Sequence, residues 1–357
     1  MGLLKNIDVI RRSLMRRMAT NIGSSRIGKK SYLKDPYKVK RVLISRPNGR
    51  LGNLLLITPI VQEVETIFPN CKIDLFVKGS VAPIIFQNYE SVDRIIQLPK
   101  KPFKSLLRYA WVWLSLKTKR YDIVINVVSY SSSGRLSVQF ATSKHKFFGE
   151  IDAAKLSKYK EYKHIAKQPV YGLREYLAQI DYPIIKKPVP DLNLKLSTAE
   201  LMKGKRTLEE LVGNKKQTIC LFTYATAHKC HSKLWWAKFY KKLKKDFPKY
   251  NIIEVLPVEN VSQIDFKAPT FYSKNIREIG ALIAHSTVFI GADSGIMHLA
   301  SAVNTPTIGL FSVPNLEVYE PYNSKSKAIN TTKLTIRKCI KEVKDILVAL
   351  MPFIEAA

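Results

Sequence analysis

The sequence predicts an α/β protein of two successive lobes, each a parallel sheet covered by helices. Short β-rich apolar runs alternate with helical stretches from residue 39 onward, which is the pattern of βαβ units. The alternation weakens across residues 150–215, a region that contains four prolines and that we interpret as the connection between the lobes. It then begins again. A length of 357 residues also matches about two domains.

In the first lobe, apolar runs predict strands over residues 39–45, 72–77, 94–98 and 121–128. A helix is expected over residues 54–68, ending before Pro69. Another is expected over residues 102–117, where one broad face is apolar and Trp111 lies near its edge. This second helix is either a headgroup-contacting helix or a core helix of the lobe.

In the second lobe, the predicted strands cover residues 218–224, 252–256, 288–292 and 307–311. The predicted helices cover residues 199–212, 234–246, 276–285, 295–303 and 338–350. Ligands of parallel sheets bind beyond the carboxyl ends of the strands, so the informative residues are those that follow each strand.

The charge balance is unusual. There are 59 Lys and Arg against 28 Asp and Glu, a net charge of +31, which indicates an anionic partner: nucleic acid, a membrane surface or a phosphorylated substrate. Residues 1–50 alone hold fourteen cations against two aspartates. Residues 3–18 form a basic amphipathic pattern that suits an anionic membrane surface, or else packs on the protein's own body. Residues 19–38 are expected to be a linker.

Several classes are disfavoured. The four cysteines are far apart and form no CxxC pair, which favours a reducing cytosol over a disulfide framework. No apolar run approaches the roughly 20 residues of a membrane span. Four arginines between positions 11 and 17 are incompatible with the apolar core of a secretory signal.

The first candidate segment follows the first predicted strand. Gly52 lies where that strand turns into a helix, a place where backbone and ligand can approach closely. Arg50 adds a full charge to the partial positive charge of the helix N-terminus. The segment matches neither a Walker A loop nor GxGxxG, so it is also compatible with a simple strand-to-helix turn.

The second segment, residues 289–300, is more informative. An apolar strand ends in Asp293, and a helix is expected from about Gly295, capped by Asp293 or Ser294. His298 lies four residues after Ser294 and so shares its helix face. The pattern predicts a diphosphate site at this helix N-terminus; the alternative is a plain N-cap with a histidine satisfied inside the helix.

The third segment, residues 223–236, also joins a strand to a helix. Thr226 and Lys233 offer a hydroxyl and a point charge to phosphate oxygens. His228, Cys230 and His231 have no fourth ligand at a sensible spacing, so we expect no metal site.

These segments resemble glycosyltransferase family 9, which contains the ADP-heptose:lipopolysaccharide heptosyltransferases. Residues 50–59 (RLGNLLLITP) are similar to its arginine–glycine–aspartate–threonine–proline segment, and residues 232–235 (SKLW) to its lysine–any–tryptophan element. Residues 293–300 (DSGIMHLA) are similar to its most recognisable motif, and residues 311–314 and 320–322 resemble the loop that follows. The resemblance extends from about residue 39 to residue 323.

The resemblance implies a GT-B-like fold, two Rossmann-like lobes facing a central cleft. It implies an N-terminal acceptor lobe over residues 39–190, a connection and donor lobe over 191–330, and a C-terminal helix over 331–357 that returns to the first lobe. The activity implied is an inverting, metal-independent sugar transfer without a cofactor, from a nucleotide-diphosphate donor such as ADP-heptose. The implied donor-binding residues are Thr226, Lys233, Glu259, Asp293, Ser294, Gly295 and His298.

Arg50 and Gly52 are expected on the acceptor or phosphate side of this site. Asn53 occupies the position at which the family usually has an aspartate, its general base. An inverting transfer needs a base for the acceptor hydroxyl, and a neutral amide has no usable basicity. Either another carboxylate or histidine serves, or the acceptor's own phosphate or carboxylate assists, or the chain is inactive.

The expected partners are therefore a nucleotide-sugar donor, an anionic lipid-linked glycan acceptor such as lipopolysaccharide core, and a membrane surface contacted by the N-terminal basic helix. We expect a monomer, peripheral to the cytoplasmic face of the inner membrane, that does not bind nucleic acid. The alternatives are a non-catalytic nucleotide-sugar or glycolipid-binding protein, indicated by Asn53, and a basic nucleic-acid-binding protein, indicated by charge alone.

Overall fold

The computed structural model describes residues 22–26, 33, 35–100, 105–150, 152–183, 185–323 and 325–354. The chain divides into two compact units. Unit 1 consists of Met1–Arg50 and Ile57–Pro190, and unit 2 of Leu51–Leu56 and Asp191–Ala357. The helix predicted over residues 3–18, and half of the linker over 19–38, lie outside the described residues.

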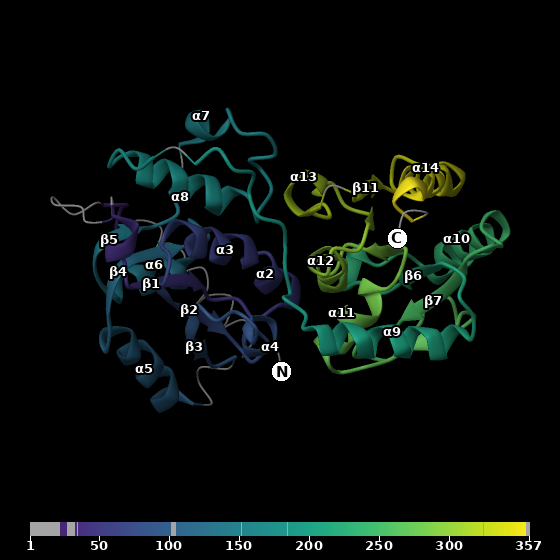
Figure 1. The fold of residues 1–357 in the computed structure, drawn as a ribbon, viewed down its shortest axis with the longest axis horizontal. Helices are drawn as coiled ribbons and strands as arrows, with labels where there is room; N and C mark the ends of the chain where they lie inside the picture. The colour runs from purple at the N-terminus through teal and green to yellow at the C-terminus, as the bar shows by residue number, and fades with distance from the viewer. Residues whose placement is uncertain are drawn as a thin grey trace, which may run out of the picture. The chain divides into compact units, whose positions relative to one another are not determined.

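Unit 1 is built on a five-stranded sheet in which every pairing is parallel, in the order β3-β2-β1-β4-β5. The strands are β1 (Arg41–Arg46), β2 (Lys72–Lys78), β3 (Val92–Leu98), β4 (Arg120–Asn126) and β5 (Thr142–Phe147). The helices around it (Figure 1) are α3 (Thr58–Ile67), α4 (Ala82–Phe86), α5 (Leu106–Leu114), α6 (Ser132–Phe140), α7 (Ala153–Leu156) and α8 (Gln168–Ala178).

Unit 2 holds a six-stranded parallel sheet in the order β11-β10-β9-β6-β7-β8. The strands are β6 (Thr218–Phe222), β7 (Asn251–Val255), β8 (Thr270–Phe271), β9 (Val288–Ala292), β10 (Thr307–Phe311) and β11 (Lys327–Asn330). The helices are α2 (Leu51–Leu55), α9 (Thr198–Val212), α10 (Lys233–Asp246), α11 (Ile276–Ala284), α12 (Gly295–Ala302), α13 (Leu316–Tyr319) and α14 (Ile336–Ile354).

The two sheets confirm the predicted fold class. In each unit the chain moves outward from a central strand, then crosses to the other side of that strand and moves outward again, which is the Rossmann order. Strands β6, β9 and β10 are buried along their whole length, as parallel strands covered on both faces are. The crossing point in unit 2 lies between β6 and β9, and this is where doubly wound sheets bind ligands.

The helix predicted over residues 54–68 is in fact two helices. Helix α2 ends at Leu55, and α3 begins at Thr58 with Pro59 in its first turn, where a missing N–H costs nothing. The break matters for the fold because α2 belongs to unit 2, whereas α3 belongs to unit 1.

The C-terminal helix α14 packs within unit 2. Cys339, Ile340, Val343 and Leu347 are buried in the unit 2 core, together with Trp236 and Phe239 of α10. The physical reason is the apolar stripe of α14, which completes a core that the sheet and α10 leave open on that side.

Three strands escaped prediction, namely β5, β8 and β11. The sequence of β5 is TSKHKF and that of β11 is KAIN, so neither contains the apolar run that marks the central strands. Strand β8 has only two residues. All three are outer strands of their sheets, and tertiary pairing rather than local pattern makes them strands.

Candidate functional site

The crossing point of the unit 2 sheet carries an ion pair between a buried aspartate and a partly exposed lysine. Asp293 directly follows β9 and is only 4% exposed. Lys229 lies in the loop that follows β6, and its Nζ is 2.6 Å from Asp293 Oδ2. A cation and an anion that follow the two strands flanking the crossing point are thus brought together where a ligand is expected.

Lys229 is held in this position by a strained turn. Ala227, two residues earlier, has φ +55°, a conformation that non-glycine residues adopt at a cost. Ser312 donates a hydrogen bond from Oγ to the carbonyl of His228 at 3.1 Å, which ties the turn to the loop after β10. The Lys229 ammonium also lies 5.5 Å from the centre of the Tyr319 ring. Strain of this kind is characteristic of functional loops.

Helix α12 begins beside this pair. Ser294 is its N-cap, and its Oγ accepts a hydrogen bond from the Met297 amide at 3.3 Å. The first amides of the helix, beginning with Gly295, have no intrahelical acceptor and carry the positive end of the helix dipole. We call Lys229, Asp293, Ser294, Gly295 and Tyr319 the crossing-point cluster. Its amides and its lysine are suited to an anionic group.

Helix α2 brings the first sequence segment to this cluster. A Cβ atom added to Gly52 would lie 2.9 Å from His298 Cδ2 and 3.3 Å from Gly295 Cα. One added to Gly295 would lie 3.1 Å from the Gly52 nitrogen and 3.2 Å from Leu51 Cβ. At Gly52 a Cβ would therefore force a shift of its neighbour, and at Gly295 it would be tightly packed, so small residues favour the close contact between α2 and α12. Two segments far apart in the sequence meet here.

Asn53 and Arg50 of the first segment, and His298 of α12, differ in how far they are exposed. Asn53 follows Gly52 on α2 and is half-buried. Arg50 is exposed immediately before α2, and its amide donates to Asn48 Oδ1 at 2.9 Å. His298 is 3% exposed and packs beneath Gly52, so burial accounts for this histidine at least as well as ligand contact does.

Lys233 is directed elsewhere. Its Nζ pairs with Asp265 in the loop after β7 at 2.8 Å, and both side chains are more than half exposed. Glu259 is exposed in that same loop. Thr226 is also exposed, three residues before Lys229. The sequence assigned the phosphate-binding charge to Lys233, whereas the cation beside Asp293 is Lys229. The feature of the sequence that could have identified Lys229 is its position between β6 and α10, because β6 pairs with β9, the strand that precedes Asp293.

A buried carboxyl connects the loops after β6 and β7. Glu254 is fully buried and accepts hydrogen bonds from Thr223 Oγ1 at 2.5 Å and Ser262 Oγ at 2.6 Å. Burial raises the pKa of Glu254, while these two hydrogen bonds act against that rise. Thr223 begins the loop of Lys229, and Ser262 lies in the loop of Asp265. Glu254 therefore fixes both loops to the sheet.

The histidine nearest to Lys233 has a structural environment. His231 Nε2 is 2.7 Å from Thr331 Oγ1, and its ring lies against Trp235 with centroids 4.2 Å apart. Burial lowers the pKa of His231 to about 4, so it is neutral at physiological pH. Among the described residues, no three His, Cys, Asp or Glu side chains are grouped to hold a metal ion.

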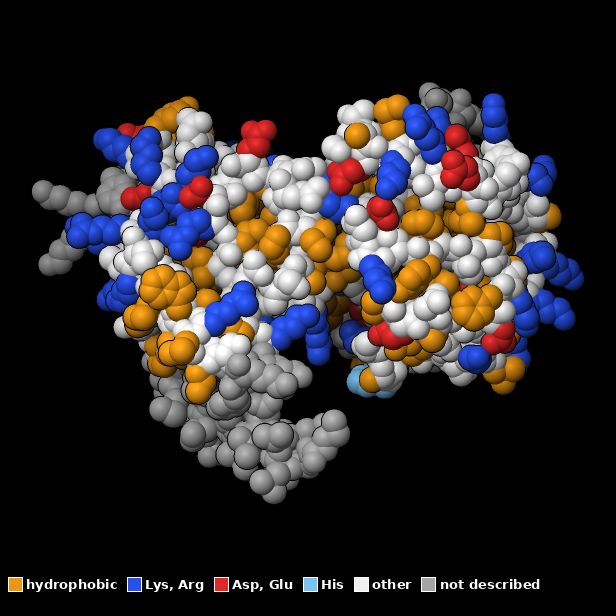
Figure 2. Space-filling view, turned by 90° about the horizontal axis from the view of Figure 1, so that it is seen from below, with side chains coloured by type: hydrophobic (Ala, Val, Ile, Leu, Met, Phe, Trp, Pro, Cys, Tyr) orange, Lys and Arg blue, Asp and Glu red, His pale blue; other side chains and the backbone are white. Residues whose placement is uncertain are grey.

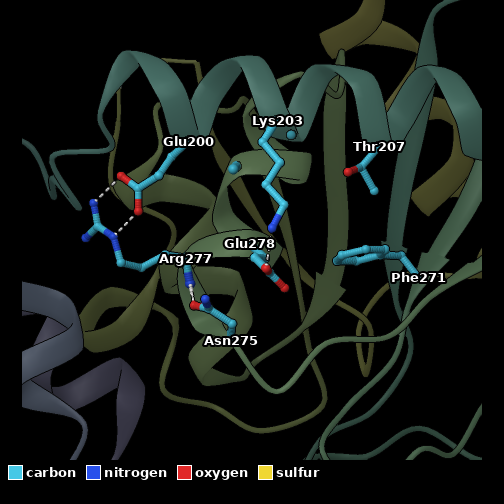
Figure 3. A pocket seen from close by; sticks show the side chains of 9 residues that line it. Glu200, Lys203, Thr207, Phe271, Asn275, Arg277 and Glu278 are labelled. Carbon is cyan, nitrogen blue, oxygen red and sulfur yellow. Dashed lines mark hydrogen bonds and ion pairs between the residues drawn. The ribbon is translucent and has the colours of Figure 1, made fainter.

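A separate cavity of about 320 Å³ lies between α9 and α11 (Figure 3). Its charged side chains are paired with one another. Lys203 Nζ is 2.8 Å from Glu278, and Arg277 donates to both carboxylate oxygens of Glu200 at 2.5 and 2.8 Å. Arg277 holds the pKa of Glu200 well below its usual range. We interpret this cavity as part of the contact between α9 and α11, where the ion pairs hold α11 in position.

Comparison with known proteins agrees with this architecture. Residues 273–347 match the model of the family described as glycosyltransferase family 9 (heptosyltransferase). Lipopolysaccharide heptosyltransferase 3 of Escherichia coli K12 is 23% identical over 296 residues, which cover 76% of this chain and 82% of that protein.

Solved structures share the fold. A family 9 glycosyltransferase from Veillonella parvula superposes with a TM-score of 0.68 at 16% identity, over 87% of this chain and 97% of that one. ADP-heptose lipopolysaccharide heptosyltransferase II of E. coli superposes with a TM-score of 0.64 at 16% identity, over 87% and 99% of the two chains. The matched family segment contains β9, α12 and Asp293 of the crossing-point cluster. The chain thus resembles the heptosyltransferases of glycosyltransferase family 9, by the match of residues 273–347 to the family model and by the fold that it shares with solved members.

Proposed function

We propose that this protein transfers a heptose from ADP-heptose to a lipopolysaccharide core or a related lipid-linked glycan. The proposal rests on the family, on relatives named as lipopolysaccharide heptosyltransferases, and on the charge of the crossing-point cluster. We further propose that the transfer inverts the anomeric carbon and takes place at the cytoplasmic face of the inner membrane. The protein would act there as a peripheral monomer.

The observation that carries the proposal is the pair of Lys229 and Asp293 beside the N-terminus of α12. When the bond from the sugar to the diphosphate breaks, negative charge develops on the departing phosphate. Amides fixed at a helix N-terminus and a lysine ammonium stabilise such charge without reorganising, which lowers the barrier. Because these groups supply positive charge, we propose that the transfer needs no divalent metal.

The acceptor hydroxyl must lose its proton as it attacks the anomeric carbon. Asn53 cannot accept that proton, but its amide can hydrogen-bond the acceptor and orient it. We therefore propose a positioning role for Asn53 and assign the base to another group, either a side chain of the enzyme or a phosphate or carboxylate of the acceptor itself.

The test is a transfer assay with the full chain, ADP-heptose and lipopolysaccharide truncated before its heptoses. Mass spectrometry should detect an added heptose, and chelation of divalent metals should leave the rate unchanged. Asp293→Asn should abolish the product, whereas the matched control Asp265→Asn should retain most of it. If ADP-heptose binds but no heptose is transferred to any core acceptor, the enzymatic proposal is wrong.

Asn53 favours a second candidate, a protein that binds a nucleotide-sugar without turnover. The two candidates differ in a measurable way. Thermal unfolding with ADP, UDP, GDP and their sugars identifies the nucleotide in either case. Only the enzyme also releases ADP when both donor and acceptor are present.

A further inference from the structure

Helix α5 of unit 1 is apolar on nearly every side. Its inner face packs into the lobe. Val112 is buried in the hydrophobic core cluster that contains Phe76, and Tyr109 and Trp113 pack against that cluster. The ring of Trp113 meets that of Phe76 edge-on, with centroids 5.3 Å apart. This face holds the helix to the lobe, and it uses only three of the helix's eight apolar side chains.

The outer face of α5 is equally apolar and lies in solvent. Leu107 is 89% exposed, Trp111 68%, Leu106 61% and Leu114 55%. At about 100° per residue these side chains cover an arc of about 140°, with exposed Ala110 inside it. We call these five residues the α5 outer face. A helix that is apolar all round is normally buried, so an exposed face of this kind indicates an occupant.

The charge around α5 identifies that occupant. Residues 94–121 contain eight Lys and Arg and no Asp or Glu. On the described part of this segment, Arg108, Lys117, Lys119 and Arg120 are exposed. Figure 2 shows apolar side chains gathered on the side of unit 1 where α5 lies, with basic side chains beside them. Apolar side chains on a stretch of chain that carries only cations complement an anionic lipid surface.

The geometry favours a helix that lies in the plane of the interface. Helix α5 has nine residues, about 14 Å of helix, which is far too short to cross a bilayer. More generally, none of the helices in the described ranges combines the length and hydropathy of a membrane span. The indole of Trp111 is the side chain that lipid headgroup regions accommodate best.

We propose that the α5 outer face docks unit 1 onto a bilayer of anionic phospholipid. Leu106, Leu107, Trp111 and Leu114 enter the headgroup boundary, and the flanking cations contact lipid phosphates. In the sequence, the α5 outer face is separate from the basic segment over residues 3–18. It does not depend on the proposed function, because vesicle binding requires neither donor nor acceptor.

The test is flotation of the full chain with vesicles of phosphatidylethanolamine and phosphatidylglycerol, compared with vesicles of phosphatidylcholine alone. The double variant Leu107→Glu/Trp111→Glu should lower the affinity for anionic vesicles about tenfold or more. The matched control is Met202→Glu, because Met202 is 54% exposed in unit 2. It should bind as the native chain does. Both variants alter exposed side chains, so thermal unfolding should remain close to native.

A second measurement locates the helix. Lipids brominated near the glycerol should quench tryptophan emission of the native chain, and Trp111→Phe should lose most of that quenching while still binding the vesicles. Two results would overturn the proposal. One is unchanged vesicle affinity in the double variant, which would assign binding to other segments such as residues 3–18. The other is a dimer that the double variant dissociates, without vesicle binding by the native chain, which would identify a second copy as the occupant.

Discussion

Lys229, rather than Lys233, should supply the charge that holds the diphosphate of the nucleotide. We compare the variants Lys229→Met and Lys233→Met. Each substitution removes one ammonium group and keeps an unbranched side chain. Lys229 lies 2.6 Å from a buried carboxylate beside α12, whereas Lys233 is bound at the surface to Asp265. The two substitutions therefore remove charges from very different surroundings.

The magnitude follows from that difference. Two unit charges about 4 Å apart interact by about 4 kcal/mol at the effective dielectric of a protein surface. Part of the Lys229 charge is already committed to Asp293, so we expect a loss of about 1.4 to 2.8 kcal/mol, which is tenfold to a hundredfold in the Kd for ADP. Lys233 is 64% exposed and screened by water and salt, so its removal should change that Kd by less than about threefold.

The assay is calorimetric titration with ADP and with adenosine, at low and at moderate salt. Lys229→Met should weaken ADP alone, because adenosine has no phosphate, and should reduce the salt dependence of ADP binding. Lys238→Met, an exposed lysine on α10, is the matched control. A larger loss in Lys233→Met than in Lys229→Met would refute the reasoning. An equal loss of adenosine affinity would do so too, because it would indicate general disruption of the loop.

Three further predictions concern single residues. Asn53→Asp should change kcat by less than about threefold if another group is the base; a rise of about a hundredfold, typical of a general base, would show that the native site lacks one. Gly52→Ala places a Cβ 2.9 Å from His298 Cδ2, so urea unfolding should show a loss of about 1 to 3 kcal/mol together with weaker ADP binding. For His231, burial lowers the pKa from 6.5 to about 4, so the unfolded chain binds more protons between these values and stability falls as pH falls through them. That loss should reach about 3 kcal/mol near pH 4, and His231→Gln should largely remove it in urea unfolding at pH 7 and pH 4.5.

The fold class was predictable because central parallel strands are buried on both faces, and burial selects apolar runs that a sequence displays. Strand β9 and its successor Asp293 illustrate this, since the strand, the cap at Ser294 and the helix from Gly295 all follow from local pattern. The outer strands were not predictable in this way. In β5 the sequence TSKHKF has no apolar run, and pairing with β4 makes it a strand.

The sequence by itself determined two parallel α/β lobes, the strand–helix junctions at which a ligand is expected, and a basic chain with an amide at the position of the expected base. These are properties of short segments, so they can be read from the local periodicity and the chemistry of the residues. Only the tertiary structure decided that α2 joins unit 2, that α14 completes its core, and that Lys229 meets Asp293 while Lys233 pairs with Asp265. The reason is physical: two lysines four residues apart in the sequence have different partners because the fold brings a buried carboxylate to Lys229 and an exposed one to Lys233.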